Sequence, residues 1–298
     1  MFRHFLIPLD GSRLAEAALP PAAWLARALN ATVTLAHFIE RDAPAAVHGE
    51  RHLTNPAEAT RYLGDVAQHF FGKEADILFH VHSAEVKNVA ESIVDHAGEF
   101  GADLVVMCAH GKRGLKRLIE GSIAQRVIGT GRCPVLLLHP DAPPEKGFSR
   151  IMVPIDGDPE HEKALRLADE LAAAIGAHLH LLSVVPTLRT LAGGEAATGI
   201  MLPAATSELL AMSEASARTH LAELAHSRAE GALPGTIAVR RGDPAAQIVA
   251  EADEQHIDLI VIASHGKAGM NAFWSGSVAP HIPTMTHLPL LLVPAHHS

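Results

Sequence analysis

Two Gly-Ser pairs lie at predicted helix starts, where their chemistry suits phosphate binding. They are Gly121-Ser122 and Gly276-Ser277. Glycine lets a ligand approach the backbone, serine caps the first helical turn, and the free N–H groups at the positive helix end attract phosphate. A single pair would be an ordinary helix cap. Because the pair recurs at matching places, each time after a second glycine (Gly111 or Gly266), the pattern indicates a phosphate site.

Two other phosphate-binding patterns do not fit this sequence. The P-loop pattern needs serine or threonine after Gly-Lys, but arginine follows Gly111-Lys112 and alanine follows Gly266-Lys267. Gly129-Thr-Gly131 is similar to part of a dinucleotide fingerprint. It precedes a predicted strand instead of following one, so we reject that interpretation.

The spacing of the glycines is specific. Gly111 is followed after nine residues by Gly121-Ser122, and Gly266 is followed after nine residues by Gly276-Ser277. Both runs resemble the latter part of the ATP motif of the universal stress protein family, Gly-x-x-Gly-x9-Gly-Ser/Thr.

Three further segments are similar to the same family. They are Pro8-Leu-Asp-Gly11, Pro154-Ile-Asp-Gly157 and Gly242-Asp-Pro244. The likeness covers nearly the whole chain, so the sequence resembles a tandem member with two copies of the domain.

The resemblance implies an adenine-nucleotide site in each copy. It places the strand-one aspartate beside the nucleoside, the residue that ends strand two against adenine, and the two glycine loops at the ribose and phosphates. The implied residues are Asp10, Phe38, Cys108, His110, Gly111, Gly121, Ser122 and Ile123 in the first copy, and Asp156, Val184, Ala263, His265, Gly266, Gly276, Ser277 and Val278 in the second. The implied ligand is ATP, ADP or AMP, with or without Mg²⁺.

Four of these positions bear on activity. Cys108 and Ala263 stand where the family motif has its first glycine. His110 and His265 are interpreted as shaping their loops and not as general bases, because the sequence places no carboxylate to orient either imidazole. No catalytic residue is assigned. A nucleotide-binding regulatory module of the stress response, a slow ATPase, and a scaffold with a lapsed or different pocket all remain open.

Basic residues distinguish the two copies. Lys112, Arg113, Lys116 and Arg117 follow the first glycine loop, whereas the second copy keeps only Lys267. If these side chains turn towards the pocket, the first copy should bind a polyphosphate more tightly. A solvated loop face is the alternative.

An internal repeat positions these loops. Residues 5–11 recur as 151–157, and residues 102–112 recur as 257–267. The aspartates Asp10 and Asp156 are 146 residues apart and the histidines His110 and His265 are 155 apart, so the second copy carries nine extra residues between these points. The chain therefore holds two copies of one domain.

Apolar runs alternate with helical patterns in each copy. In the first copy the expected strands are 2–9, 32–38, 76–82, 103–109 and 134–138, and the expected helices are 12–29, 56–71, 85–100 and 122–130. The second copy repeats the pattern over 150–293, with Asp158 and Pro159 as an expected helix start. Such a pattern predicts α/β architecture, two Rossmann-like doubly wound domains with helices on both faces of a parallel sheet.

The resemblance adds a strand order of 3-2-1-4-5 in each five-stranded sheet. We expect domains at 1–140 and 149–298, joined by a proline-rich linker at 141–148. The two fifth strands, 134–138 and 289–293, are apolar and would lie at sheet edges, so we expect them to pack together. A homodimer remains open.

Composition narrows the class of partner. A net charge of −9 argues against a nucleic-acid binder. The apolar runs are too short to span a bilayer, so no membrane partner is expected. With only two cysteines, Cys108 and Cys133, the chain suits a reducing compartment, and we expect a cytoplasmic protein.

Histidine is unusually frequent, at 21 residues. His80 with His82, and His178 with His180, could each share one face of a strand. Neither pair has further ligands nearby in zinc-like spacing, so we expect strand and surface histidines and no metal site.

Overall fold

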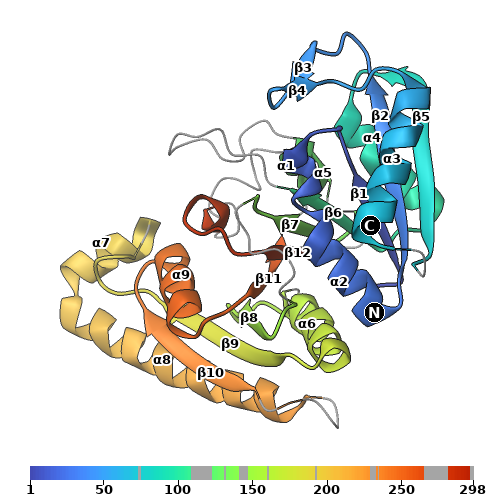
Figure 1. The fold of residues 1–298 in the computed structure, drawn as a ribbon. Coiled ribbons are helices and arrows are strands. Elements are labelled where there is room, and N and C mark those ends of the chain that lie inside the picture. Colours follow the sequence, from blue (N-terminus) through green and yellow to red (C-terminus); the bar gives the residue numbers. More distant parts are fainter. Residues whose placement is uncertain are drawn as a thin grey trace.

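The computed structural model of the chain describes residues 1–72, 75–108, 123–130, 132–140, 147–159, 161–191, 193–228, 233, 235–264 and 281–295. Two similar halves lie side by side, with β7 and β12 between them (Figure 1).

The first half is an alternation of strands and helices. Its strands are β1 (His4–Pro8), β2 (Thr32–Glu40), β3 (Ala46–Val47), β4 (Glu50–Arg51), β5 (Ile77–Val86), β6 (Leu104–Cys108) and β7 (Val135–Leu138). Its helices are α1 (Arg13–Glu16), α2 (Leu19–Leu29), α3 (Pro56–Phe70), α4 (Val89–Phe100) and α5 (Ile123–Gly129).

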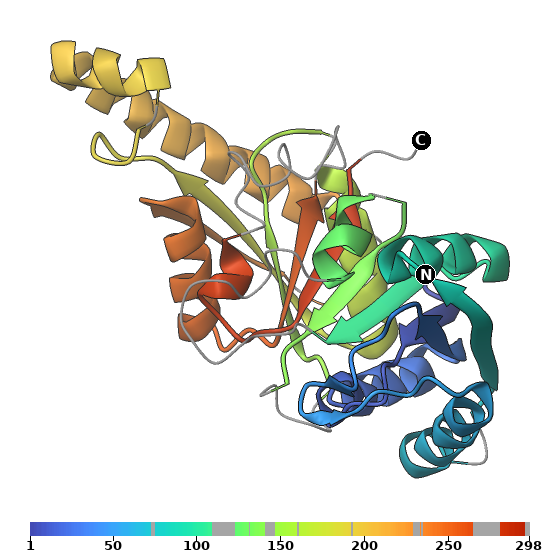
Figure 2. The ribbon, with the colours of Figure 1, turned by 90° about the horizontal axis from the view of Figure 1, so that it is seen from above.

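The second half repeats this alternation. Its strands are β8 (Arg150–Pro154), β9 (His178–Val185), β10 (Thr236–Arg241), β11 (Leu259–Ser264) and β12 (Leu290–Pro294). Its helices are α6 (Glu162–Ile175), α7 (Gly193–Met201), α8 (Pro203–His226), α9 (Pro244–Glu254) and a 3-10 turn, η1 (Ile282–Thr284). The 24-residue α8 packs along β9 and β10 at the outer end of this half (Figure 2).

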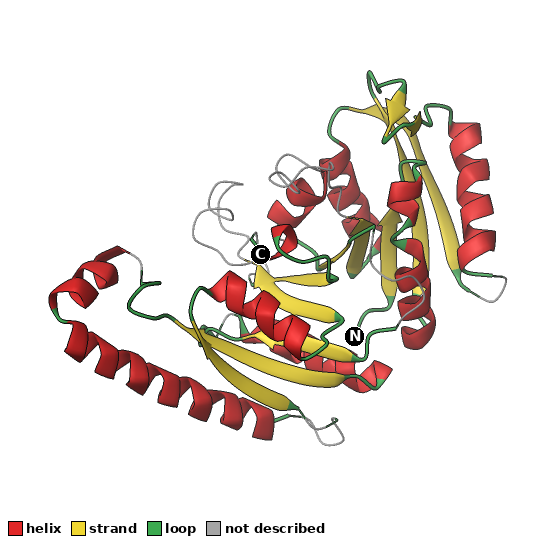
Figure 3. Cartoon of the chain, turned by 60° about the vertical axis from the view of Figure 1, so that its left-hand side comes forward, coloured by secondary structure: helices red, strands yellow, loops and turns green. Residues whose placement is uncertain are grey.

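All ten long strands form one sheet in the order β10-β9-β8-β11-β12-β7-β6-β1-β2-β5. Within each half the order is 3-2-1-4-5 and all pairs are parallel, which confirms the predicted fold class. Figure 3 shows helices on both faces of the strands.

The two fifth strands join the halves, as predicted. β7 and β12 pair antiparallel, with Leu136 opposite Leu291. These two leucines are 155 residues apart, the offset of the repeat itself, so each strand meets its own counterpart. Val135 and Leu292 are 1% and 3% exposed. The pairing therefore places a pseudo-twofold axis between the halves and removes two apolar edges from solvent.

The core has two layers, one on each face of the sheet. Phe5 and Ile7 belong to the layer under α2, α3 and α6, whereas Leu6 belongs to the layer under α4, α5 and α9. Both layers contain residues of both halves. Burial of alternate strand residues on opposite faces explains why the strands are apolar almost throughout.

Three helix predictions were wrong in part. The expected helix 12–29 is two helices, since Pro20 and Pro21 have no N–H with which to bond the carbonyls one turn earlier. The expected helix 85–100 begins only at Val89, because Glu85 and Val86 extend β5.

The third error concerns α6. Asp158 and Pro159 do not start it; the backbone N–H of His161 bonds the carbonyl of Asp158 in a separate turn, and the helix begins at Glu162.

The structure describes only the last two residues of the predicted linker, 147 and 148. Residues 141–146 lie outside the described residues. Phe148 is buried and its ring meets that of Trp24 on α2 edge-on, with centroids 5.8 Å apart. The domain limits at 140 and 149 stay a prediction.

Candidate functional site

A cavity of about 290 Å³ opens at the carboxyl ends of the first half's strands. Asp10 after β1, Phe38 on β2, Cys108 ending β6 and Ile123 starting α5 all line it. The strand order of this half reverses between β1 and β6, which is where doubly wound sheets bind ligands. The four lining residues are those of the first copy's predicted nucleotide site that the structure describes; their role in binding stays a prediction.

Asp10 is held in place by the turn that follows it. Its carboxylate accepts hydrogen bonds from the N–H of Ser12 at 2.9 Å and from the hydroxyl of Ser12 at 2.6 Å. The intervening Gly11 has φ +89°, a conformation that side chains rarely adopt, and a Cβ there would lie 2.8 Å from Leu53. The Asp-Gly pair thus turns the chain tightly at the cavity edge and directs a carboxylate towards it.

A small hairpin, β3 and β4, contributes a wall that the sequence analysis missed. His48 and Gly49 form its turn, both with positive φ (51° and 87°). His48 and Val47 line the cavity, and Nε2 of His48 lies 3.8 Å from Oδ2 of Asp10. A two-residue turn with glycine second is a hairpin signal, but strands of two residues are too short to show alternation.

His37 fastens this wall to the sheet. The side chain is 1% exposed, with Nδ1 2.7 Å from the carbonyl of Leu9 and Nε2 2.9 Å from the carbonyl of Leu53. Both partners are acceptors, so the ring serves both only when each nitrogen carries hydrogen. Nearby His52 also lines the cavity, and its Nδ1 is buried without a hydrogen-bond partner among the described residues.

Phe38 separates the cavity from the interior. Its side chain is 5% exposed and its ring meets the ring of His96 edge-on at 5.2 Å. Cys108, which also lines the cavity, is buried at the end of β6 and is not disulfide-bonded. Burial above all, and then the nearby Asp103 carboxylate, raises the pKa of the other cysteine, Cys133, to about 12, so little of it is thiolate at neutral pH.

The second half places its described site residues at the corresponding strand ends. Asp156 follows β8, Val184 lies near the end of β9 and Ala263 near the end of β11. The Asp156 carboxylate accepts hydrogen bonds from the N–H of Asp158 at 3.1 Å and from Nδ1 of His161 at 2.7 Å. Each first-strand aspartate thus bonds the backbone N–H two residues on.

The remaining predicted site residues lie outside the described residues. They are His110, Gly111, Gly121, Ser122, His265, Gly266, Gly276, Ser277 and Val278. The basic run Lys112, Arg113, Lys116 and Arg117 lies outside them as well.

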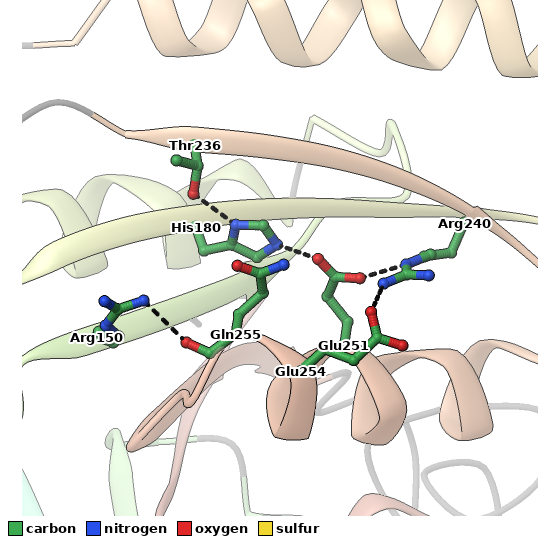
Figure 4. A network of polar contacts seen from close by, with 7 residues as sticks. All are labelled: Arg150, His180, Thr236, Arg240, Glu251, Glu254 and Gln255. Carbon is green, nitrogen blue, oxygen red and sulfur yellow. Dashed lines mark hydrogen bonds and ion pairs between the residues drawn. The ribbon is translucent and has the colours of Figure 1, made fainter.

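A partly buried ionic network links β9, β10 and α9 in the second half (Figure 4). Arg240 bonds both Glu251 and Glu254, and these hydrogen bonds raise the pKa of the guanidinium. Glu251 is 1% exposed and accepts a hydrogen bond from Nε2 of His180 at 2.8 Å. Nδ1 of His180 lies 2.6 Å from the hydroxyl of Thr236. Burial is the main reason that the pKa of His180 is lowered, although Glu251 opposes it.

Fold and cavity together define a tandem Rossmann-like α/β protein with a ligand-sized space at a strand-order switch point. The model of the universal stress protein family matches residues 1–139 and 147–294. The chain belongs to the universal stress protein family.

Individual relatives agree with this assignment. A universal stress protein of Mycolicibacterium smegmatis is 26% identical over 305 residues, which cover 97% of this chain and 96% of that protein. One of Methanocaldococcus jannaschii is 30% identical over 140 residues, 46% of this chain and 82% of the relative. A solved universal stress protein from Archaeoglobus fulgidus has the same fold, with a TM-score of 0.65, 16% identity, and coverage of 97% of this chain and 95% of that one.

Within the described part of the chain, no helix is both long and apolar enough to traverse a bilayer.

Proposed function

We propose that this chain is a cytoplasmic regulatory protein of the stress response that binds an adenine nucleotide in the cavity of its first half. One observation carries the proposal: Asp10, Phe38, Cys108 and Ile123, from four separate segments, line a single cavity at the switch point between β1 and β6. The family assignment supports it, because these positions match residues that the resemblance gives to the nucleotide.

The lining suits a nucleoside. The cavity is mostly apolar and at the lower end of the ~300–1,000 Å³ usual for small-ligand sites. Phe38 offers an aromatic wall for a base, and the oriented carboxylate of Asp10 offers an acceptor for hydroxyl or amino hydrogens. Phosphates would extend towards the glycine loop that ends at Gly121-Ser122, next to α5.

The first half is proposed as the tighter site, because Lys112, Arg113, Lys116 and Arg117 precede its helix start in the sequence. ATP, ADP and AMP are the candidate ligands, with or without Mg²⁺. Neither Cys108 nor Cys133 forms a disulfide, which suits the reducing cytoplasm.

Calorimetric titration of the intact chain with ATP, ADP and AMP tests this function. In Gly121→Val the added side chain should block phosphate approach, and affinity should fall at least about tenfold, the equivalent of one charge-assisted hydrogen bond. Gly276→Val should have the smaller effect. The control is Gly64→Val on α3, where an added side chain meets open space.

Unchanged affinity in the double variant Gly121→Val, Gly276→Val would rule out the proposed pocket. Loss of binding in Gly276→Val alone would reverse the ranking of the halves. A phosphate-release assay on the same samples separates a regulatory binder from a slow ATPase.

A further inference from the structure

Three histidines meet behind Phe38, between β5 and α4. His80 and His82 alternate on β5 and so share one of its faces, and His96 projects from α4 onto that face. One ring nitrogen of each lies within 4.8 Å of the others. The rings of His96 and Phe38 are in contact, so the cluster adjoins the proposed nucleotide cavity without lining it.

Hydrogen bonds orient His96 as a ligand. Its Nδ1 lies 2.7 Å from the carbonyl of Ser92, one helical turn earlier, and a carbonyl can only accept. Nδ1 therefore carries the hydrogen, and Nε2 of the neutral ring directs its lone pair at Nδ1 of His82, 3.1 Å away. A backbone carbonyl on the far nitrogen is the usual support of a metal-binding histidine.

His80 lacks such a partner. Its Nε2 is buried and makes no hydrogen bond with any described residue. A buried polar atom without a hydrogen-bond partner is costly, and a bound metal ion would satisfy this imidazole nitrogen.

The second half has different side chains at the positions equivalent to this histidine cluster. The N-caps Asn88 of α4 and Asp243 of α9 are equivalent, and eight residues further on stand His96 and Glu251. Eleven residues beyond each cap, both halves have a glutamate, the first being Glu99.

The strands correspond as well. In the strand pairing His82 lies opposite Phe38, and Arg240 lies opposite Val184, the residue equivalent to Phe38. The second half thus neutralises Glu251 with the guanidinium of Arg240 (Figure 4). In the first half, positions 82 and 96 are both histidine. The guanidinium cation of Arg240 therefore has no side-chain counterpart at position 82.

We propose that His80, His82 and His96 bind a divalent metal ion of the first transition series, with Zn²⁺ as the representative ion. Imidazole nitrogen is a preferred ligand of Zn²⁺, Co²⁺, Ni²⁺ and Cu²⁺. Zinc–nitrogen bonds of 2.0–2.1 Å in tetrahedral geometry require nitrogens roughly 3.3 Å apart. The nitrogens of His82 and His96 are already 3.1 Å apart, so it is the ring of His80 that moves closer to the other two. The metal takes the place of the hydrogen between His82 and His96, and His82 adopts the tautomer with hydrogen on Nε2.

Glu99 completes the site. Its Oε2 lies 3.9 Å from Nε2 of His96, and its exposed side chain is free to move the remaining distance. Three imidazoles and one carboxylate would leave the bound cation with a single positive charge in excess, which suits a half-buried position.

The test uses the full chain without a histidine tag, stripped with a chelator. Zn²⁺ is titrated by calorimetry, and Co²⁺ is followed by its visible absorption, which is intense in tetrahedral sites. The variants are His82→Gln and His96→Gln. The control is His69→Gln, which removes an exposed histidine of α3 and allows for adventitious binding among 21 histidines.

The proposal expects one tight site, an affinity at least about tenfold lower in either cluster variant, and an unchanged affinity in the control. It also expects Zn²⁺ to raise the unfolding temperature of the parent chain and of His69→Gln but not of His96→Gln. Equal binding by all four proteins, or no tetrahedral Co²⁺ spectrum in the parent chain, would overturn the proposal whatever the stability of the variants.

Discussion

Burial controls the charge of His180, because the ring lies between β9 and α9 at 6% exposure. Its pKa is below the ordinary value of about 6.5, so the unfolded chain binds a proton at a pH where the folded chain does not. Stability from this residue is therefore complete above about pH 6.5 and falls as the pH drops towards the lower, folded pKa.

Replacing His180 should make the unfolding free energy depend less on pH. We expect the unfolding free energy of the parent chain to fall between about pH 7.5 and 5.5, and to fall less in His180→Gln. Urea unfolding at several pH values measures the slope. His178→Gln is the control, since His178 is exposed on the same strand. An equal slope in His180→Gln and the parent chain would contradict the prediction.

At the scale of elements, β10 and α9 are held together by ion pairs of unequal depth. Arg240 bonds Glu251, which is buried, and Glu254, whose side chain is 56% exposed. A charged group that loses its partner in the interior keeps the full cost of its desolvation, whereas water replaces a lost partner at the surface.

The two glutamates should therefore differ when each is neutralised. Glu251→Gln should lower the unfolding free energy by about 1.5–3 kcal/mol, since it weakens charged hydrogen bonds to Arg240 and His180. Glu254→Gln should cost less than about 1 kcal/mol. Chemical denaturation of both variants measures the difference. Equal losses would show that depth does not set the strength of this network.

Most elements could be predicted from the sequence because their signals are long. The runs around Leu6, Leu35 and Val105 are apolar on both faces, as buried parallel strands require. The hairpin of β3 and β4 could not be predicted in this way, since two residues per strand carry no periodicity.

A residue of the candidate site could be predicted only where its own segment of the sequence marks it out. Asp10 follows an apolar run and stands out from the sequence. The histidine cluster could not be predicted, because its ligands come together through tertiary packing. His96 lies on a helix 14 residues beyond His82, and a single histidine at that distance is not by itself a zinc motif. Along the sequence no third ligand stands near His80 and His82, and the fold brings His96 to them.

The whole molecule carries a charge that its histidines can reverse. Net charge is −9 with all histidines neutral, the 21 histidines exceed that number, and the pI is about 6.1. Repulsion between molecules should vanish near that pH, which lies close to the ordinary histidine pKa of about 6.5.

We expect light scattering to rise and then fall as the pH is lowered from about 7 through 6 to 5. Return to neutral pH is the control: scattering that disappears reports association of folded chains, and scattering that persists reports acid unfolding. A flat profile between about pH 7 and 5.5 would contradict the prediction.

The antiparallel contact of β7 with β12 has a consequence for how the two halves can differ. Leu136 faces Leu291 as two identical subunits of a dimer would face each other across a twofold axis. In a dimer of identical chains, every substitution is made twice and both pockets change together. Here one chain carries both halves, so histidine at position 96 and glutamate at position 251 can coexist in one symmetric frame. A single molecule can thereby carry two chemically different sets of side chains in halves of the same shape.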